Sequence, residues 1–260
     1  MPYSAEQVAH FVREAARWQD RASQLVGELS GRAYRHERSR LLVTHGLGRR
    51  LMTLTRCIKC VYGLIPPDEE APSREELQDA AIFLQSFLIN VFGAQDNLAC
   101  LWVWESGLQH NGREVRPEWI GLRPSNTVVR NSLSPQLREY LESMTGWFDY
   151  LENYRHALAH RIPLYIPPKR LDDEAVKEYR RLEVSLVEAI RHSDFERYGA
   201  IIAEQARLGV FESWMMHSYG PTDTDGRPVR FHGQMVCDLA TVVDLGERMI
   251  AELDAMERGP

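Results

Sequence analysis

The sequence predicts an all-α protein, a helical bundle of about seven helices that forms a single domain over residues 1–260. Apolar residues recur at alternating spacings of three and four along most of the chain, which is typical of helices with one buried face. No segment alternates apolar and polar residues as a half-buried strand does. Prolines and glycines gather between the periodic segments, where they separate one helix from the next.

The first two helices are expected at about residues 5–30 and 32–63. The second is expected to end before Pro66 and Pro67, because proline cannot continue a helix. The apolar stripe of the first helix consists of Val8, Phe11, Ala15, Trp18, Ala22, Leu25 and Leu29.

The third helix is expected to be the buried centre of the bundle. Ser73 with Glu76 three residues later forms a capping box, the pattern that starts many helices. The segment after it is apolar nearly all round, as expected of a helix that others surround. Residues 106–134 then lose the helical period among glycines, prolines and asparagines, so we expect a long loop there.

Four further helices complete the prediction, at about 135–160, 173–191, 194–217 and 234–257. The first of these ends against the turn RIPLYIPPK, and a polar loop separates the last two. No internal repeat divides the chain.

The composition restricts the kind of nucleic-acid binding and the cellular location that we expect. The net charge of −6 argues against a broadly basic surface that wraps nucleic acid without regard to sequence, so any nucleic-acid contact must be local. The four cysteines lie in apolar helical segments and lack the dense spacing of a secreted disulfide-rich domain. The N-terminus is charged from Glu6, and no stretch of 18 uninterrupted apolar residues occurs. We therefore expect a cytoplasmic protein with no membrane contact.

Three short patterns resemble metal sites but lack the ligands to complete one. Cys57 and Cys60 form a C-x2-C pair, and structural zinc requires two further ligands at a suitable spacing. Four residues after His36, Arg40 stands where a zinc-protease signature has its second histidine. The DTDG segment at 223–226 has no acidic residue at the closing position of a calcium loop. Neither a metal nor another cofactor is expected.

The strongest candidate for chemistry is an arginine followed five residues later by a histidine. With 28 arginines and 9 histidines in 260 residues, chance predicts about one such pair, so the spacing alone says little. The chain contains three such pairs: Arg40/His45, Arg155/His160 and Arg227/His232. Only the Arg155/His160 pair closes a helix among polar side chains, which include Asp149, Asn153 and His156.

Arginine and histidine together fit RNA cleavage without a metal. The reaction needs a group that moves the proton of a 2′-hydroxyl or of the leaving oxygen near neutral pH, and histidine is such a group. It also needs a fixed positive fork on the phosphoryl oxygens, which arginine supplies without losing its charge. Asp149 or Asn153 is placed to orient either residue. The plainer interpretation is that Arg155 and His160 interact with the negative end of the helix and cap its carbonyl groups.

The segment RHALAH, followed by a turn at Tyr165 and a new helix, resembles the signature of the HEPN superfamily. Members carry an arginine, a polar residue, a short apolar stretch and a histidine, and His156 is here the polar residue beside Arg155. Asp149 precedes Arg155 by six residues, a spacing similar to the acidic position of a HEPN ribonuclease domain. Two features depart from the pattern. Many members have asparagine or aspartate where His156 stands, and Tyr165 follows His160 by five residues rather than two.

The resemblance implies a four-helix HEPN-like core at about 73–191, with flanking helices at 5–63 and 194–257 outside it. It also implies a metal-independent endoribonuclease of toxin–antitoxin or phage-defence type, with RNA as substrate and an antitoxin or defence protein as partner. Arg155 and His160 diverge by about 140° around one helix, and the resemblance implies a homodimer in which two motifs meet. The alternatives are a non-catalytic HEPN-like module that binds a nucleotide, RNA or a protein, and a helical scaffold without a ligand.

Asp96 and Asn97 are polar residues within the apolar third helix. Buried polar groups need hydrogen-bond partners. We therefore expect these two side chains either to support the helix that carries Arg155 or to form a purely structural network.

Overall fold

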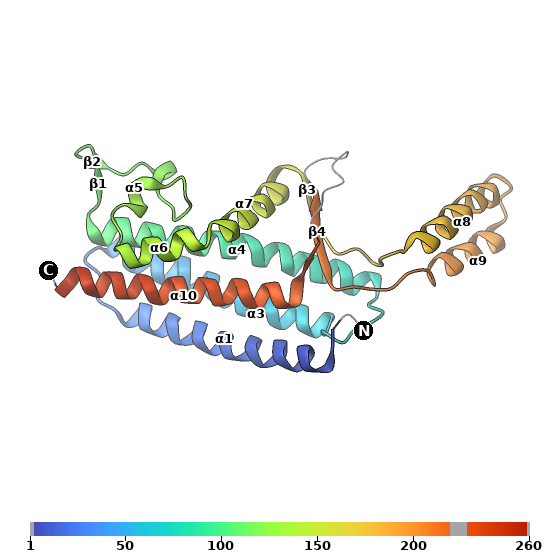
Figure 1. The fold of residues 1–260 in the computed structure, drawn as a ribbon, viewed down its shortest axis with the longest axis horizontal. Helices are drawn as coiled ribbons and strands as arrows, with labels where there is room; N and C mark the ends of the chain where they lie inside the picture. Colours follow the sequence, from blue (N-terminus) through green and yellow to red (C-terminus); the bar gives the residue numbers. More distant parts are fainter. Residues whose placement is uncertain (1–2, 219–227, 259–260) are drawn as a thin grey trace.

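The centre of the molecule is a bundle of long helices that lie side by side (Figure 1). The structure, a computed structural model, describes residues 3–218 and 228–258. The predicted all-α helical bundle is confirmed, because these helices share one large apolar core. The four longest members of the bundle are α1 (Ala5–Gly31), α3 (Gly48–Leu64), α4 (Arg74–Ser106) and α10 (Phe231–Arg258).

Helix α4 is the central element, and it begins where the capping box predicts. The backbone N–H of Glu76 donates to Ser73 Oγ at 3.2 Å, and the backbone N–H of Ser73 donates to Glu76 Oε2 at 2.7 Å. The helix ends at Gly107, whose φ of +65° suits glycine. Among the described helices, α4 alone is long and apolar enough to cross a membrane, and a buried core helix has the same properties.

The second predicted helix begins later than expected and contains an irregular turn. It consists of α2 (Glu37–Leu41), a π-helical turn η1 (Leu42–Leu47) and then α3. The chain before α2 is extended, because the backbone N–H groups of Arg35 and His36 donate to the carboxylate of Glu105 at the end of α4. This long-range contact replaces the first helical turns that the sequence predicts.

The predicted helix at 135–160 is two helices, α6 (Pro135–Ser143) and α7 (Thr145–His160). They separate at Met144, whose φ of −99° and ψ of 11° leave the helical region. The long loop before α6 contains four short elements: β1 (Gln109–His110), β2 (Arg113–Glu114), the 3₁₀ helix η2 (Pro117–Trp119) and α5 (Thr127–Arg130).

A small antiparallel sheet corrects the prediction of a helix over 194–217. That segment begins as α9 (Phe195–Gln205) but turns at Gly209, whose φ is +76°, and then forms a strand. A Cβ at Gly209 would lie 2.4 Å from the carbonyl oxygen of Arg170, so the close approach requires glycine. The strands, in the order in which they pair, are β3 (Ile162–Tyr165), β4 (Trp214–Ser218) and β5 (Val229–Arg230).

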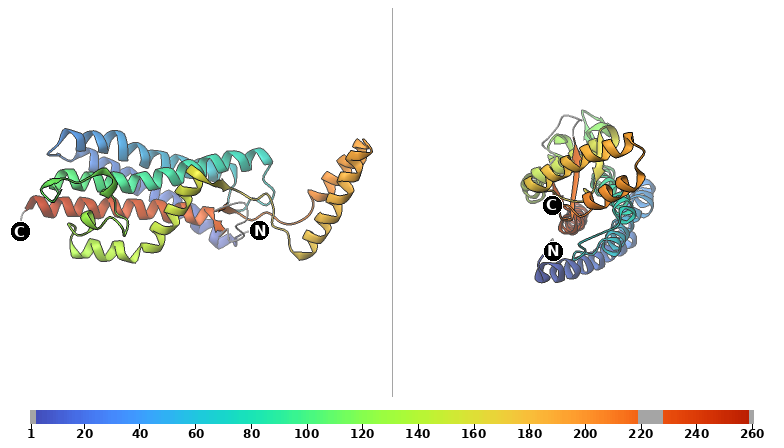
Figure 2. Two further views of the ribbon diagram at one scale, coloured as in Figure 1. Left: turned by 90° about the horizontal axis from the view of Figure 1, so that it is seen from above. Right: turned by 90° about the vertical axis from the view of Figure 1, so that its right-hand side faces the viewer.

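Helices α8 (Asp173–Arg191) and α9 form a hairpin beyond one end of the bundle (Figure 2). The hairpin has its own small cluster of buried side chains, which consists of Leu182, Ala189 and Ile201. The range 73–191 therefore contains α4, α6 and α7 from the main core and α8 from the separate hairpin. The HEPN-like character of that range stays a prediction.

Candidate functional site

Helix α7 carries the arginine–histidine element on its exposed side. Its buried residues are Phe148, Leu151, Tyr154 and Ala157, which pack into the core. The backbone N–H of Arg161 donates to the carbonyl oxygen of Ala157 at 3.0 Å and closes the last turn, after which β3 begins. The exposed side of α7 is therefore fixed by the packing of its opposite side.

A buried carboxylate on α10 holds the other end of α7. Asp238 accepts hydrogen bonds from Trp147 Nε1 at 2.9 Å, from Tyr150 Oη at 3.2 Å and from Gln234 Nε2 at 2.8 Å. Burial raises the pKa of this carboxyl to about 6, although the three hydrogen bonds oppose the shift. This anchor does not show in the sequence, because Trp147 and Tyr150 on α7 lie about ninety residues before Asp238 in the chain.

Arg155 is exposed, and its guanidinium lies over the ring of Phe92 on α4. Its Cζ atom is 4.8 Å from the ring centroid, and that of Arg123, from the long loop, is 5.7 Å from the same centroid. Arg123 also donates to Glu152 Oε1 at 2.7 Å. Arg155 makes no hydrogen bond within residues 3–218 and 228–258, so its donors face solvent.

Asp96 lies one turn beyond Phe92 on α4, within electrostatic range of three guanidinium groups. Burial raises the pKa of its carboxyl to about 6, and the charges of Arg123, Arg155 and Arg50 reduce that shift. Gln95 Nε2 donates a hydrogen bond to Asp96 Oδ1 at 2.9 Å. We call Arg50, Arg123 and Arg155, together with Asp96, the arginine cluster.

Arg50 reaches the cluster from α3 by lying across Gly93 of α4. Its Nε donates to Asn97 Oδ1 at 3.0 Å, and its Nη1 donates to Asn90 Oδ1 at 3.1 Å. A Cβ at Gly93 would lie 2.3 Å from Arg50 Cζ, so only glycine leaves room for this guanidinium. Asn97 thus supports α3 rather than the helix that carries Arg155.

Three of the predicted site residues line a second feature, an open depression of about 470 Å³ along α7. Its lining residues are Asp149, Glu152, Asn153, His156 and Arg161. Asp149, Glu152, Asn153 and His156 recur at spacings of three and four, which put them on one side of α7, and Arg161 directly follows the helix. His156 Nε2 lies 3.6 Å from Glu152 Oε1, so Glu152 connects this depression to Arg123 and the arginine cluster.

His160 and Tyr165 lie apart from both features, at the end of α7 and on β3. Neither they nor Arg155 line the depression. The side chain of His160 is exposed and has no hydrogen bond or ion pair within the described ranges. Tyr165, expected in a turn, pairs with Met216 in the sheet and is 44% exposed.

The discounted metal patterns stay incomplete in the described part of the chain. Cys57 and Cys60 are free thiols on α3, and His36 directly precedes α2. Within residues 3–218 and 228–258, no three His, Cys, Asp or Glu side chains gather to hold one ion. The DTDG segment at 223–226 and Arg227 lie outside the described residues.

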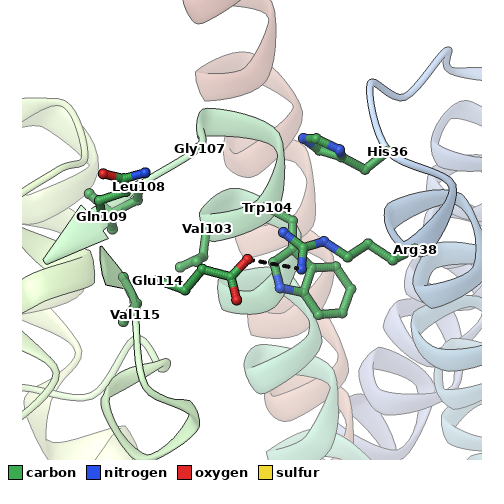
Figure 3. A pocket seen from close by; sticks show the side chains of 9 residues that line it. All are labelled: His36, Arg38, Val103, Trp104, Gly107, Leu108, Gln109, Glu114 and Val115. Carbon is green, nitrogen blue, oxygen red and sulfur yellow. Dashed lines mark ion pairs between the residues drawn. The ribbon is translucent and has the colours of Figure 1, made fainter. Parts of the chain in front are cut away.

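A smaller pocket of about 170 Å³ lies at the C-terminal end of α4 (Figure 3). Arg38 lies over the ring of Trp104, with Cζ 4.9 Å from its centroid, and pairs with Glu114 at 3.7 Å. The charged groups that line this pocket therefore neutralise each other. Its volume is also below the roughly 300 Å³ at which small-molecule sites begin.

In comparisons with known proteins, no family model, no curated protein and no solved structure matches the chain.

Proposed function

We propose that this protein is a metal-independent endoribonuclease that binds the RNA backbone along the exposed side of α7. The observation that carries the proposal is the placement of Arg155. Its guanidinium is held over Phe92 while its donors face solvent, and Arg123 lies over the same ring. A positive fork that is positioned by packing and has unused donors suits a phosphodiester.

In this proposal Arg155 binds the phosphoryl oxygens, and histidine transfers the protons. A histidine takes the proton of the ribose 2′-hydroxyl, whose oxygen then attacks phosphorus. The bond from phosphorus to the 5′ oxygen breaks, and a protonated histidine donates to that leaving oxygen. The products are a 2′,3′-cyclic phosphate and a 5′-hydroxyl, so no external oxidant or reductant is needed.

His160 is the histidine that the resemblance to HEPN proteins assigns to proton transfer, and His156 is the polar residue beside Arg155. Asp149 and Asn153 line the same depression as His156, which suits them to orient it. Arg155 and His160 diverge by about 140° around α7. The proposal therefore includes a homodimer in which the motif of a second copy completes the site, and an antitoxin or defence protein as its cellular partner.

One observation favours a second candidate, a non-catalytic RNA-binding module. His160 has no orienting hydrogen bond within the described residues, whereas a general base usually has one. Arg155 and Arg123 on Phe92 would still bind a phosphate or a base without cleaving RNA.

Incubation of the purified protein with end-labelled RNA in EDTA separates the two candidates. Cleavage with a 2′,3′-cyclic phosphate end supports the ribonuclease, and its loss in His160→Ala assigns it to this site. Binding without cleavage, weakened by Arg155→Ala, supports the module. Absence of both cleavage and binding would remove RNA as the ligand.

A further inference from the structure

The hairpin of α8 and α9 exposes more large apolar side chains than its small core buries. Four of them belong to α8: Tyr179 is 36% exposed, Val187 is 43%, Ile190 is 55% and Val184 is 65%. On α9, Phe195 is 80% exposed, Tyr198 is 37% and Ile202 is 42%. Val184 lies about 200° round α8 from Leu182, and we call the other six side chains the hairpin face.

The six side chains lie on the same side of the hairpin. Leu182 and Ala189 mark the side of α8 that is buried against α9. The face residues of α8 are rotated about the helix axis by about 60–140° from that side, when the angle is counted in the direction of increasing residue number. On α9 they lie about 60–120° from Ile201 in the same sense. In an antiparallel pair of helices, equal rotations from the shared seam bring side chains to the same side. The hairpin face is therefore one mostly apolar surface, with the exposed Glu183 among its side chains.

The opposite side of the hairpin is charged, and its charges pair across the two helices. Arg197 on α9 lies 3.6 Å from Glu188 on α8, and Arg181 lies close enough to Glu204 for their charges to interact. The hairpin is thus amphipathic as a unit. One side has paired charges and suits water, and no element within residues 3–218 and 228–258 covers the other side.

We propose that the homodimer included in the proposed function is held together through the hairpin face, so that a second copy of this chain covers it and two hairpins form a four-helix bundle about a twofold axis. The three aromatic side chains have roughly 150–250 Å² each and the three aliphatic ones somewhat less, so the exposed fractions amount to roughly 500 Å² per copy. Two copies that cover the whole face therefore bury roughly 1,000 Å², the lower limit for a biological interface.

The charges beside the face also suit a second copy. Glu183 lies within the face on α8, and Arg180 lies at its edge, and both are exposed. A surface that carries both positive and negative charges can pair with a second copy of itself about a twofold axis. In such an isologous contact the same patch is used by both copies, so a positive group of one can lie opposite a negative group of the other. The hairpin also extends beyond the bundle, as Figure 2 shows, so the two bundles need not overlap when the hairpins pair.

Sedimentation at micromolar concentration tests the proposal, which does not depend on RNA cleavage. The wild type is expected at twice the 30.0 kDa mass of one chain, and the double variant Ile190→Glu/Phe195→Glu at the mass of one chain. The matched control is Ile82→Glu on α4, which changes a side chain 61% exposed elsewhere and should leave the dimer intact. Circular dichroism checks that all three are equally folded.

Three outcomes would overturn the proposal: a monomeric wild type, a double variant that stays dimeric, or a control that dissociates as fully as the double variant. A persistent dimer would place the contact elsewhere, for example at the end of α7. Should the double variant fold poorly, hydrogen exchange of the wild type decides instead. Protection in α8 and α9 should then rise with protein concentration, and concentration-independent protection would contradict the dimer.

Discussion

Two arginines lie against α4 and are held there in opposite ways. Arg50 is half-buried and donates two hydrogen bonds to asparagines of the helix. Arg155 is exposed, rests on the ring of Phe92 and donates no hydrogen bond within the described residues. Both contribute to the electrostatic environment of Asp96.

The difference separates a guanidinium that holds helices together from one that is available to a ligand. Donors that are already bonded to protein cannot be offered to a phosphate without leaving their partners unpaired, which is costly for half-buried groups. Donors fixed only by packing can bind a phosphate at little cost. The comparison therefore predicts that changes near Arg50 affect stability and changes near Arg155 affect function.

The largest expected effect comes from His160→Ala, which tests whether the exposed side chains of α7, Arg155 among them, cleave RNA. Loss of a general acid–base group should slow RNA cleavage by about 10²- to 10⁴-fold, while the thermal midpoint changes little because the side chain is exposed. Cleavage rates in EDTA measure the effect. The control is His45→Ala, an exposed histidine on η1. Undiminished cleavage by His160→Ala, or an equal loss in the control, would disprove the catalytic assignment.

Arg155→Lys should slow cleavage by about 10²- to 10³-fold, the usual effect of removing one transition-state donor. Lysine keeps the charge but loses the planar fork that engages two phosphoryl oxygens. Stability should stay close to that of the wild type, since Arg155 makes no hydrogen bond to a described residue. Full activity with lysine would show that charge alone suffices at this position.

Gly93→Ala tests whether the half-buried guanidinium of Arg50 stabilises the fold. The new Cβ would displace the guanidinium of Arg50 and leave the oxygens of Asn90 and Asn97 without their donor. The unpaired oxygens should cost about 1–3 kcal/mol in the free energy of unfolding, and the better helix propensity of alanine offsets up to about 1 kcal/mol of that cost. We expect a net loss, measured with denaturant. The control is Gly27→Ala on α1, where nothing lies within 4 Å of the new Cβ. That variant should gain up to about 1 kcal/mol, and equal losses in both would contradict the role of Gly93.

The last prediction concerns Asp96, whose carboxyl is influenced by the charges of both arginines. Its pKa is raised to about 6 in the folded state from 3.8. Its contribution to stability is therefore greatest below about pH 4 and is lost as the pH rises through about 6. Asp96→Asn does not titrate, so it should gain stability relative to the wild type over this interval, by about 2 kcal/mol. A difference that is constant from pH 4 to 7 would contradict the raised pKa.

Local signals predicted the bundle well, because they depend on residues close in sequence. The capping box at Ser73 and Glu76 lies where it was expected. Strand β4 escaped prediction, since its partner β3 lies about fifty residues away and its own apolar residues continue a helical period. The irregular start of α2 depends on Glu105, a residue that the local sequence before α2 does not reveal.

The candidate site was predicted in part for the same reason. Arg155, His156 and the residues beside them belong to one helix, so their spacing shows in the sequence. Arg50 and Arg123 join them only through the packing of α3 and the long loop on α4. A usable signal existed for Arg50: Asn90, Gly93 and Asn97 form a polar stripe at helical spacing on an otherwise apolar helix.

The two ends of the hairpin segment meet at its base. Arg170 and Val210 exchange two backbone hydrogen bonds of 2.8 and 3.0 Å, so the segment between them leaves and re-enters the molecule at one point. Contacts inside such a segment are local, and a unit of this kind can fold and open without disturbing the rest. The hairpin is therefore an exchangeable module, and a short turn between Arg170 and Val210 should let the bundle form without it.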